Sequence, residues 1–129
     1  METKQIWANL AVKDLERTTK FYTDLGFKSN GSSKEITSFF VGDNKFIIHF
    51  YLKKQLEKFI PEIADLSKGN EILFSLSAKS KEEVDQWAEA VRKAGGKIFL
   101  EPSNYDLGYT FGFSDLDGHK FNVLYWPGM

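Results

Sequence analysis

The chain has 129 residues, a length typical of one domain that can bury roughly two-thirds of the surface its unfolded chain exposes. Its net charge is −1, from 17 basic and 18 acidic residues that are interspersed, so we expect no nucleic-acid partner. The absence of cysteine excludes disulfides, thiolate metal sites and a cysteine nucleophile. Aromatic residues make up 16% of the chain, which predicts a ring-lined cavity or an oligomer interface.

The first half of the sequence predicts a strand, a helix and three strands. Apolar residues alternate over Ile6–Val12, the pattern of a strand. Asp14 can cap a helix that runs through Leu25, and Gly26 is placed to end it in the left-handed conformation. Short strands are expected at 27–29, 36–41 and 45–52, separated by turns at 30–33 and 42–44.

The segment 53–68 has helical spacing of its apolar residues, but Pro61 interrupts it. We interpret this segment as a broken helix or a crossover connection. The most apolar run, 46–52, is too short to span a bilayer, and the N-terminal residues lack the apolar core of a signal peptide. A cytoplasmic protein with no membrane partner is the expectation.

The second half repeats the order of the first. Residues 72–78 alternate as a strand, and Ser80 with Glu83 forms a capping box for the helix that follows. Gly95 and Gly96 end that helix. Strands are expected at 97–100, 109–113 and 119–126, with a hairpin turn at 117–118 and a loop at 103–108.

Together these patterns predict an α+β fold made of two βαβββ modules. We expect a single domain over residues 1–129, with module one at about 1–60, a connection at about 53–69 and module two at about 70–129.

Two motifs carry a family resemblance. The opening residues 9–17 (Asn-Leu-Ala-Val-Lys-Asp-Leu-Glu-Arg), followed by Phe21-Tyr22 and Leu25-Gly26-Phe27, and the closing residues 115–119 (Asp-Leu-Asp-Gly-His) are spaced as in one superfamily. They resemble the vicinal-oxygen-chelate superfamily, which includes glyoxalases, bleomycin-resistance proteins, fosfomycin-resistance enzymes and extradiol dioxygenases. The resemblance implies curved sheets that enclose a cavity, and a homodimer.

The resemblance also implies where a metal would bind. Metal-binding members place histidine, glutamate or glutamine at positions that correspond here to Trp7, His49, Glu71 and Asn122. Tryptophan offers no lone pair and asparagine is a weak ligand, so only His49 and Glu71 remain good donors. Catalytic metals normally have three protein ligands, so we predict no metal and no other cofactor.

Strand parity gives these positions another role. The opposite strand faces are apolar and should meet the helices, whereas the mixed faces should line the cavity with rings and polar groups, as in small-molecule pockets. The predicted ligand-binding residues are Trp7, Asn9, His49, Tyr51, Glu71, Ser75, Asn122 and Trp126.

Three functions stay open at this point. The first is a metal-independent, bleomycin-resistance-like protein that binds an aromatic or cationic small molecule, with a role in resistance or sequestration and with Glu71 as counter-charge. The second is a lyase or isomerase in which His49 and Glu71 are the catalytic pair, with or without a divalent metal. The third is a dimerisation module without a ligand.

Overall fold

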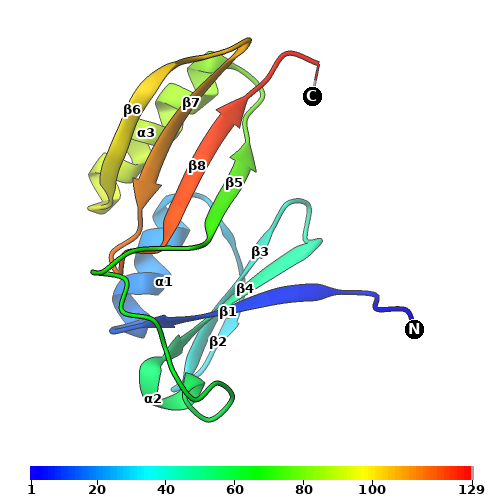
Figure 1. Ribbon diagram of the computed structural model, residues 1–129, viewed down its shortest axis with the longest axis vertical. Helices are drawn as coiled ribbons and strands as arrows, with labels where there is room; N and C mark the ends of the chain where they lie inside the picture. The colour runs from blue at the N-terminus through cyan, green and yellow to red at the C-terminus, as the bar shows by residue number, and fades with distance from the viewer. Residues whose placement is uncertain (129) are drawn as a thin grey trace. The chain divides into compact units, whose positions relative to one another are not determined.

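The chain folds as two α+β units, each with a four-stranded mixed sheet (Figure 1). The computed structural model describes residues 1–128. Unit 1 spans residues 1–64 and unit 2 begins at Asp65. The predicted order of strand, helix and three strands is confirmed in both units.

Unit 1 has the strand order β1-β4-β3-β2, in which β1 is parallel to β4 and the other pairs are antiparallel. The short helix α2 follows β4 and packs against β1 and β4. The elements are β1 (Ile6–Val12), α1 (Leu15–Asp24), β2 (Lys28–Ser32), β3 (Ile36–Val41), β4 (Phe46–Leu52) and α2 (Lys53–Leu56).

Helix α1 covers the apolar face of the unit 1 sheet. Its predicted cap is confirmed, because the Arg17 N–H donates to Asp14 Oδ1 at 3.0 Å. The fully buried Tyr22 stacks on Phe50 of β4 with ring centroids 4.6 Å apart. The core of unit 1 is therefore formed by aromatic rings on the strand face that the alternation predicts.

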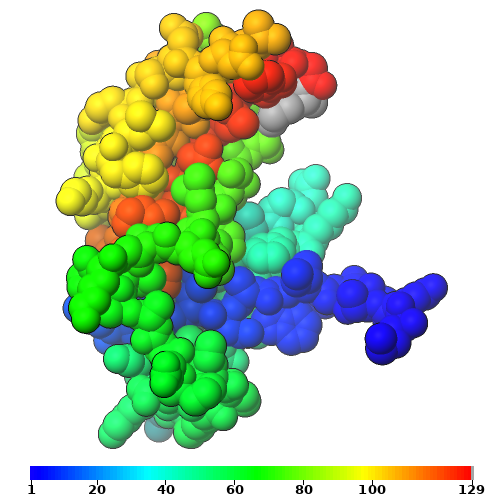
Figure 2. Space-filling view, viewed as in Figure 1, coloured from blue at the N-terminus to red at the C-terminus, as the bar shows by residue number. Residues whose placement is uncertain are grey.

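Unit 2 has the equivalent strand order β5-β8-β7-β6, with β5 parallel to β8. Its elements are β5 (Leu73–Ser77), α3 (Lys81–Ala94), β6 (Lys97–Tyr105), β7 (Gly108–Ser114) and β8 (Lys120–Tyr125). Strand β6 is an edge strand, and Figure 2 shows its atoms (yellow to orange) at the surface of unit 2.

Helix α3 covers one face of the unit 2 sheet. The Glu83 N–H donates to Ser80 Oγ at 3.1 Å, as the capping box predicts. The Glu83 carboxylate accepts from the Lys79 N–H at 3.2 Å, whereas a capping box would use the N–H of Ser80. Below the helix, the rings of Phe111, Phe113 and Phe121 are stacked, with centroids 5.7 and 5.2 Å apart.

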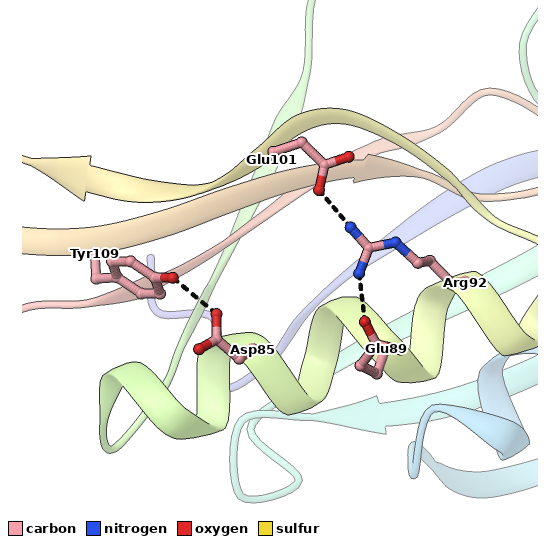
Figure 3. A network of polar contacts seen from close by, with 5 residues as sticks. All are labelled: Asp85, Glu89, Arg92, Glu101 and Tyr109. Atoms are coloured by element: carbon pink, nitrogen blue, oxygen red, sulfur yellow. Dashed lines mark hydrogen bonds and ion pairs between the residues drawn. The ribbon is translucent and has the colours of Figure 1, made fainter.

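Polar contacts hold α3 to β6 and β7 on the solvent side (Figure 3). Tyr109 donates to Asp85 at 2.8 Å. Arg92 bridges Glu89 and Glu101. Since Tyr109 alternates with Thr110 and Gly112 along β7, those two residues belong to the face opposite the helix.

The closing motif forms the turn between β7 and β8. Asp115 Oδ1 accepts hydrogen bonds from the N–H groups of Asp117 and His119, at 3.0 and 2.8 Å. Gly118 has φ +99°, the conformation that glycine adopts without strain. A turn is present as predicted, but it lies one residue earlier than 117–118: the Gly118 N–H donates to the Asp115 carbonyl, so Leu116 and Asp117 are its central residues.

Two strands are longer than predicted. Strand β2 continues to Ser32 instead of turning after Ser29, because the register shifts between these residues while Gly31 adopts φ +100°. Strand β6 continues to Tyr105 instead of ending at Leu100, so the expected loop at 103–108 is mostly a hairpin. Its Pro102 is tolerated because β6 is an edge strand with two register shifts.

Other boundaries also differ from the prediction. The segment after β4 is helical only over Lys53–Leu56, so the helix ends before Pro61. Strand β5 begins at Leu73 and β8 ends at Tyr125, which leaves Glu71 and Trp126 just outside their strands. Within residues 1–128, no helix is long and apolar enough to cross a membrane.

Candidate functional site

The mixed face of the unit 1 sheet brings four predicted site residues together. Cross-strand register aligns Asn9 of β1 with His49 of β4, and His49 in turn with Ser38 of β3. Trp7 lies two residues before Asn9, and Tyr51 two residues after His49, so both share this face. Trp7 is 49% exposed.

His49 lies between two aromatic rings. Its ring centroid is 6.2 Å from that of Trp7 and 6.1 Å from that of Tyr51. Tyr51 contacts Phe59 at 6.1 Å, and Phe59 is 75% exposed. The row from Trp7 to Phe59 is an apolar surface with one imidazole in its centre.

The imidazole of His49 has an unused polar atom. Its Nδ1 is buried, and none of the described residues offers it a hydrogen bond. Burial lowers the pKa of His49 below the ordinary value of 6.5, because desolvation disfavours the imidazolium. The lowered pKa favours the neutral ring at pH 7, in which one of the two nitrogens is a hydrogen-bond acceptor.

His49 lies between Ser38 and Asn9 in the sheet, and Ser38 already has a hydrogen-bond partner. Ser38 is 2% exposed and accepts a hydrogen bond from Asn30 Nδ2 at 3.1 Å. Asn9, on the other side of His49, is exposed. Asn9 is therefore the exposed polar side chain among these three residues, next to the half-buried His49 ring.

In unit 2, the structure joins two predicted site residues by a hydrogen bond. Ser75 Oγ donates to Asn122 Oδ1 at 2.6 Å, and Asn122 Nδ2 is 3.4 Å from Thr110 Oγ1. Thr110 donates to the Val123 carbonyl at 2.9 Å. This chain of contacts fixes the orientation of the Asn122 amide.

Two predicted site residues lie beyond the strand ends. Glu71 is exposed and precedes β5, and Trp126 follows β8. A Cβ added at Gly108 would lie 2.8 Å from Trp126 Cε3, so this ring packs on the glycine backbone. A pairing of His49 with Glu71 stays a prediction, because these residues belong to different units.

Comparisons with known proteins place this geometry in a family. The profile described as Glyoxalase/Bleomycin resistance protein/Dioxygenase superfamily matches residues 4–123. The chain belongs to this superfamily. The vicinal-oxygen-chelate resemblance of its two motifs is therefore confirmed.

Solved structures of the superfamily fold agree with this assignment. A hypothetical protein from S. aureus is 33% identical, with a TM-score of 0.87 over 97% of this chain and 95% of that one. A glyoxalase-related enzyme from Fulvimarina pelagi is 21% identical, with a TM-score of 0.83 over 97% and 90% of the two chains. The fosfomycin resistance protein FosX from Listeria monocytogenes, complexed with Mn(II) and sulfate, is 21% identical, with a TM-score of 0.74 over 99% and 94%. No curated protein matches the sequence.

The metal positions of the superfamily are poorly suited to a metal in this member. Trp7 has no lone pair to donate, and the amide oxygen of Asn122 already accepts a hydrogen bond from Ser75. Across residues 1–128, no three His, Cys, Asp or Glu side chains are grouped so that they could hold a metal ion. The donor set at these positions does not fit a divalent cation.

Sequence reasoning missed one feature of the mixed face of unit 2. The ring of Phe99 lies against Gly112, since a Cβ added there would be 2.5 Å from Phe99 Cε1. Lys120 Nζ lies 5.9 Å from the centroid of the same ring. Gly112, which lies inside a predicted strand between Phe111 and Phe113, could have indicated this contact, because a glycine within a strand often marks a place where another group comes close to the backbone.

Proposed function

We propose that this superfamily member is a metal-independent small-molecule-binding protein of the cytoplasm, of the bleomycin-resistance type, that acts by sequestration. The arrangement around His49 carries the proposal, since a neutral imidazole with an unused nitrogen lies between the rings of Trp7 and Tyr51. Such a face accepts a planar molecule by stacking, and the exposed Asn9 amide beside His49 offers a hydrogen bond that fixes its orientation.

The chemistry of the ligand follows from this face. Neutral His49 adds no positive charge, so the open rings of Trp7 and Tyr51 can also hold a cation against their π-faces. Exposed Glu71 is the proposed counter-charge. We therefore favour planar aromatic molecules, neutral or cationic.

Binding to a defined probe tests the proposal. Isothermal titration of the full chain with 9-aminoacridine, a planar cation, is expected to show saturable binding that Trp7→Ala or Tyr51→Leu weakens by about tenfold. Tyr105→Leu is the matched control, because Tyr105 is 61% exposed at the end of β6, outside the unit 1 face. If neither 9-aminoacridine nor metal-free bleomycin raises thermal stability, the binding proposal is wrong and a ligand-free dimerisation module is favoured.

Elemental analysis tests the metal-independent part of the proposal. The purified protein is expected to contain no stoichiometric Ni, Zn, Mn or Fe, and a chelator is expected to leave its melting temperature unchanged. One bound metal ion per chain, with loss of stability on its removal, would contradict this. Light scattering tests the homodimer that we propose along with it, and a monomer mass would contradict that assembly.

A lyase or isomerase is the second candidate. The unused Nδ1 of His49 and its lowered pKa favour it, because a neutral imidazole is the form that accepts a proton. Glu71 would be the second catalytic group. Consumption of fosfomycin, followed by phosphorus NMR with and without Mn(II), would support this reading if His49→Gln abolished it.

A further inference from the structure

Strand β6 contains a bulge that exposes two consecutive apolar residues. The register between β6 and β7 shifts between Ile98 and Leu100, and again between Leu100 and Ser103. Phe99 and Leu100 are 47% and 44% exposed, although neighbours on a regular strand point to opposite faces. Because Ile98 pairs with the helix-side Phe113, alternation places the Phe99 ring on the sheet face opposite α3, and the bulge brings Leu100 opposite Gly112 on that face as well.

Gly112 makes room for that ring. A Cβ at this position would lie 2.5 Å from Phe99 Cε1 and 2.6 Å from Phe99 Cζ, so any other residue would displace the ring. The Cε1–Cζ edge of the ring thus lies close to the backbone of β7, while the side chain stays about half exposed. The result is a flat apolar platform.

A positive charge lies over the Phe99 ring. Lys120 Nζ lies 5.9 Å from the Phe99 ring centroid and donates to the Gly118 carbonyl at 3.2 Å. In the part of the chain that the structure describes, no carboxylate forms an ion pair with this ammonium. Two of its three donor hydrogens are available to a ligand.

A fixed amide lies in the same row as the platform. Asn122 is directly opposite Gly112 in the β7–β8 register and two residues after Lys120, so both side chains share one face of β8. Ser75 and Thr110 hold the Asn122 amide in place. A ligand on the platform therefore meets an ordered polar group beside a cation.

We propose that this face of unit 2 binds a planar aromatic carboxylate, whose ring stacks on Phe99 and whose carboxylate pairs with Lys120. Stacking requires a flat ligand, and the unpaired ammonium requires an anion. Every residue of this site belongs to unit 2, so the inference goes beyond the function proposed for the His49 face of unit 1 and does not depend on it.

A titration of the full chain with 2-naphthoate tests the inference. In nitrogen-15 correlation spectra, the amide signals of Gly112, Lys120 and Asn122 are expected to shift with a single saturable curve. Lys120→Gln and Phe99→Leu are each expected to weaken binding by about tenfold or more, because each removes one of the two main contacts. The neutral analogue 2-naphthamide is expected to bind more weakly by a similar factor.

Lys81→Gln is the matched control. Lys81 Nζ also lies over an aromatic ring of unit 2, at 5.7 Å from the Tyr109 centroid, but on the α3 side of the sheet. This variant is expected to bind 2-naphthoate like the unmodified chain. Well-dispersed spectra of each variant establish that it folds. Gly112→Ala, which displaces the Phe99 ring, is an independent second test of the contribution of Phe99 to binding.

Each outcome of the titration has a clear meaning. No binding of 2-naphthoate, equal binding by Lys120→Gln, or shifts confined to residues outside unit 2 would overturn the inference. If 2-naphthoate binds as expected while no ligand binds at the His49 face, only the function proposed for unit 1 fails.

Discussion

Ser75 Oγ donates a 2.6 Å hydrogen bond to Asn122 Oδ1 across the parallel strands β5 and β8. In metal-binding relatives, the resemblance places a ligand at the Asn122 position. Here the only oxygen that this side chain could offer is used within the sheet. An internal contact therefore occupies the side-chain oxygen at the position where the resemblance would place a metal ligand.

Ser75→Ala tests the energetic weight of this bond. The bond is partly exposed and water can replace the serine, so we expect the free energy of unfolding to fall by only about 0.5–1 kcal/mol. Ser77→Ala, on the same face of β5, is the control, because Ser77 forms no side-chain hydrogen bond within residues 1–128. Urea unfolding of both variants measures the difference, and equal stability would contradict the prediction.

Replacing either of two glycines of β7 with alanine is expected to lower stability by different amounts. At Gly108, a Cβ would lie 2.5 Å from the Tyr125 carbonyl oxygen, and backbone cannot move aside easily. Gly108→Ala should therefore cost about 1–3 kcal/mol of stability. At Gly112, the nearest atoms belong to the end of the Phe99 side chain, which can rotate away. Gly112→Ala should cost less than about 1 kcal/mol.

A double-mutant cycle checks the cause at Gly112. In a Phe99→Ala background, Gly112→Ala is expected to lose its remaining cost, because the ring that it displaces is gone. Chemical denaturation of the four proteins measures the coupling. A cost that is unchanged in the Phe99→Ala background would show that the methyl group acts on another neighbour.

Local sequence signals were enough to predict the frame of both units. The cap at Asp14 depends on a contact three residues away, and the alternation of β4 correctly buries Ile48 and Phe50. These features depend on residues close together in the sequence, or on the alternation of apolar and polar residues along one strand. The fold class could therefore be predicted from the sequence alone.

The Phe99 platform could not be predicted in the same way. Parity places Leu100 on the helix side of β6, whereas the bulge pairs Leu100 with Gly112 and exposes it next to Phe99. The shift depends on pairing with β7, which no local pattern of β6 reports. Similarly, whether His49 Nδ1 has a hydrogen-bond partner depends on what packs against it. The sequence therefore identified His49 as a site residue but could not show that its Nδ1 is buried without a partner.

The cap of α1 gives a further prediction. Asp14→Ala removes the acceptor of the Arg17 N–H and should lower the free energy of unfolding by about 1 kcal/mol. Asp14→Ser keeps an acceptor and is expected to restore most of this loss. Thermal unfolding compares the two, and equal losses would show that the carboxylate acts through charge and not through the cap.

The state of His49 predicts how stability depends on pH. Burial lowers its pKa in the folded chain, while the unfolded chain has the ordinary value of 6.5. Below pH 6.5 the unfolded chain therefore binds more protons at this residue, so falling pH favours unfolding. Above that pH both states are neutral, and His49 adds no slope.

His49→Gln removes this contribution. Between pH 7.5 and pH 5, the variant is expected to lose less stability than the unmodified chain, measured by urea unfolding at each pH. The imidazole C–H shift of His49 in proton NMR reads the same property directly, and its midpoint is expected below 6.5. A midpoint at or above that value would contradict a buried, neutral imidazole and would remove the main support for ligand binding at this face.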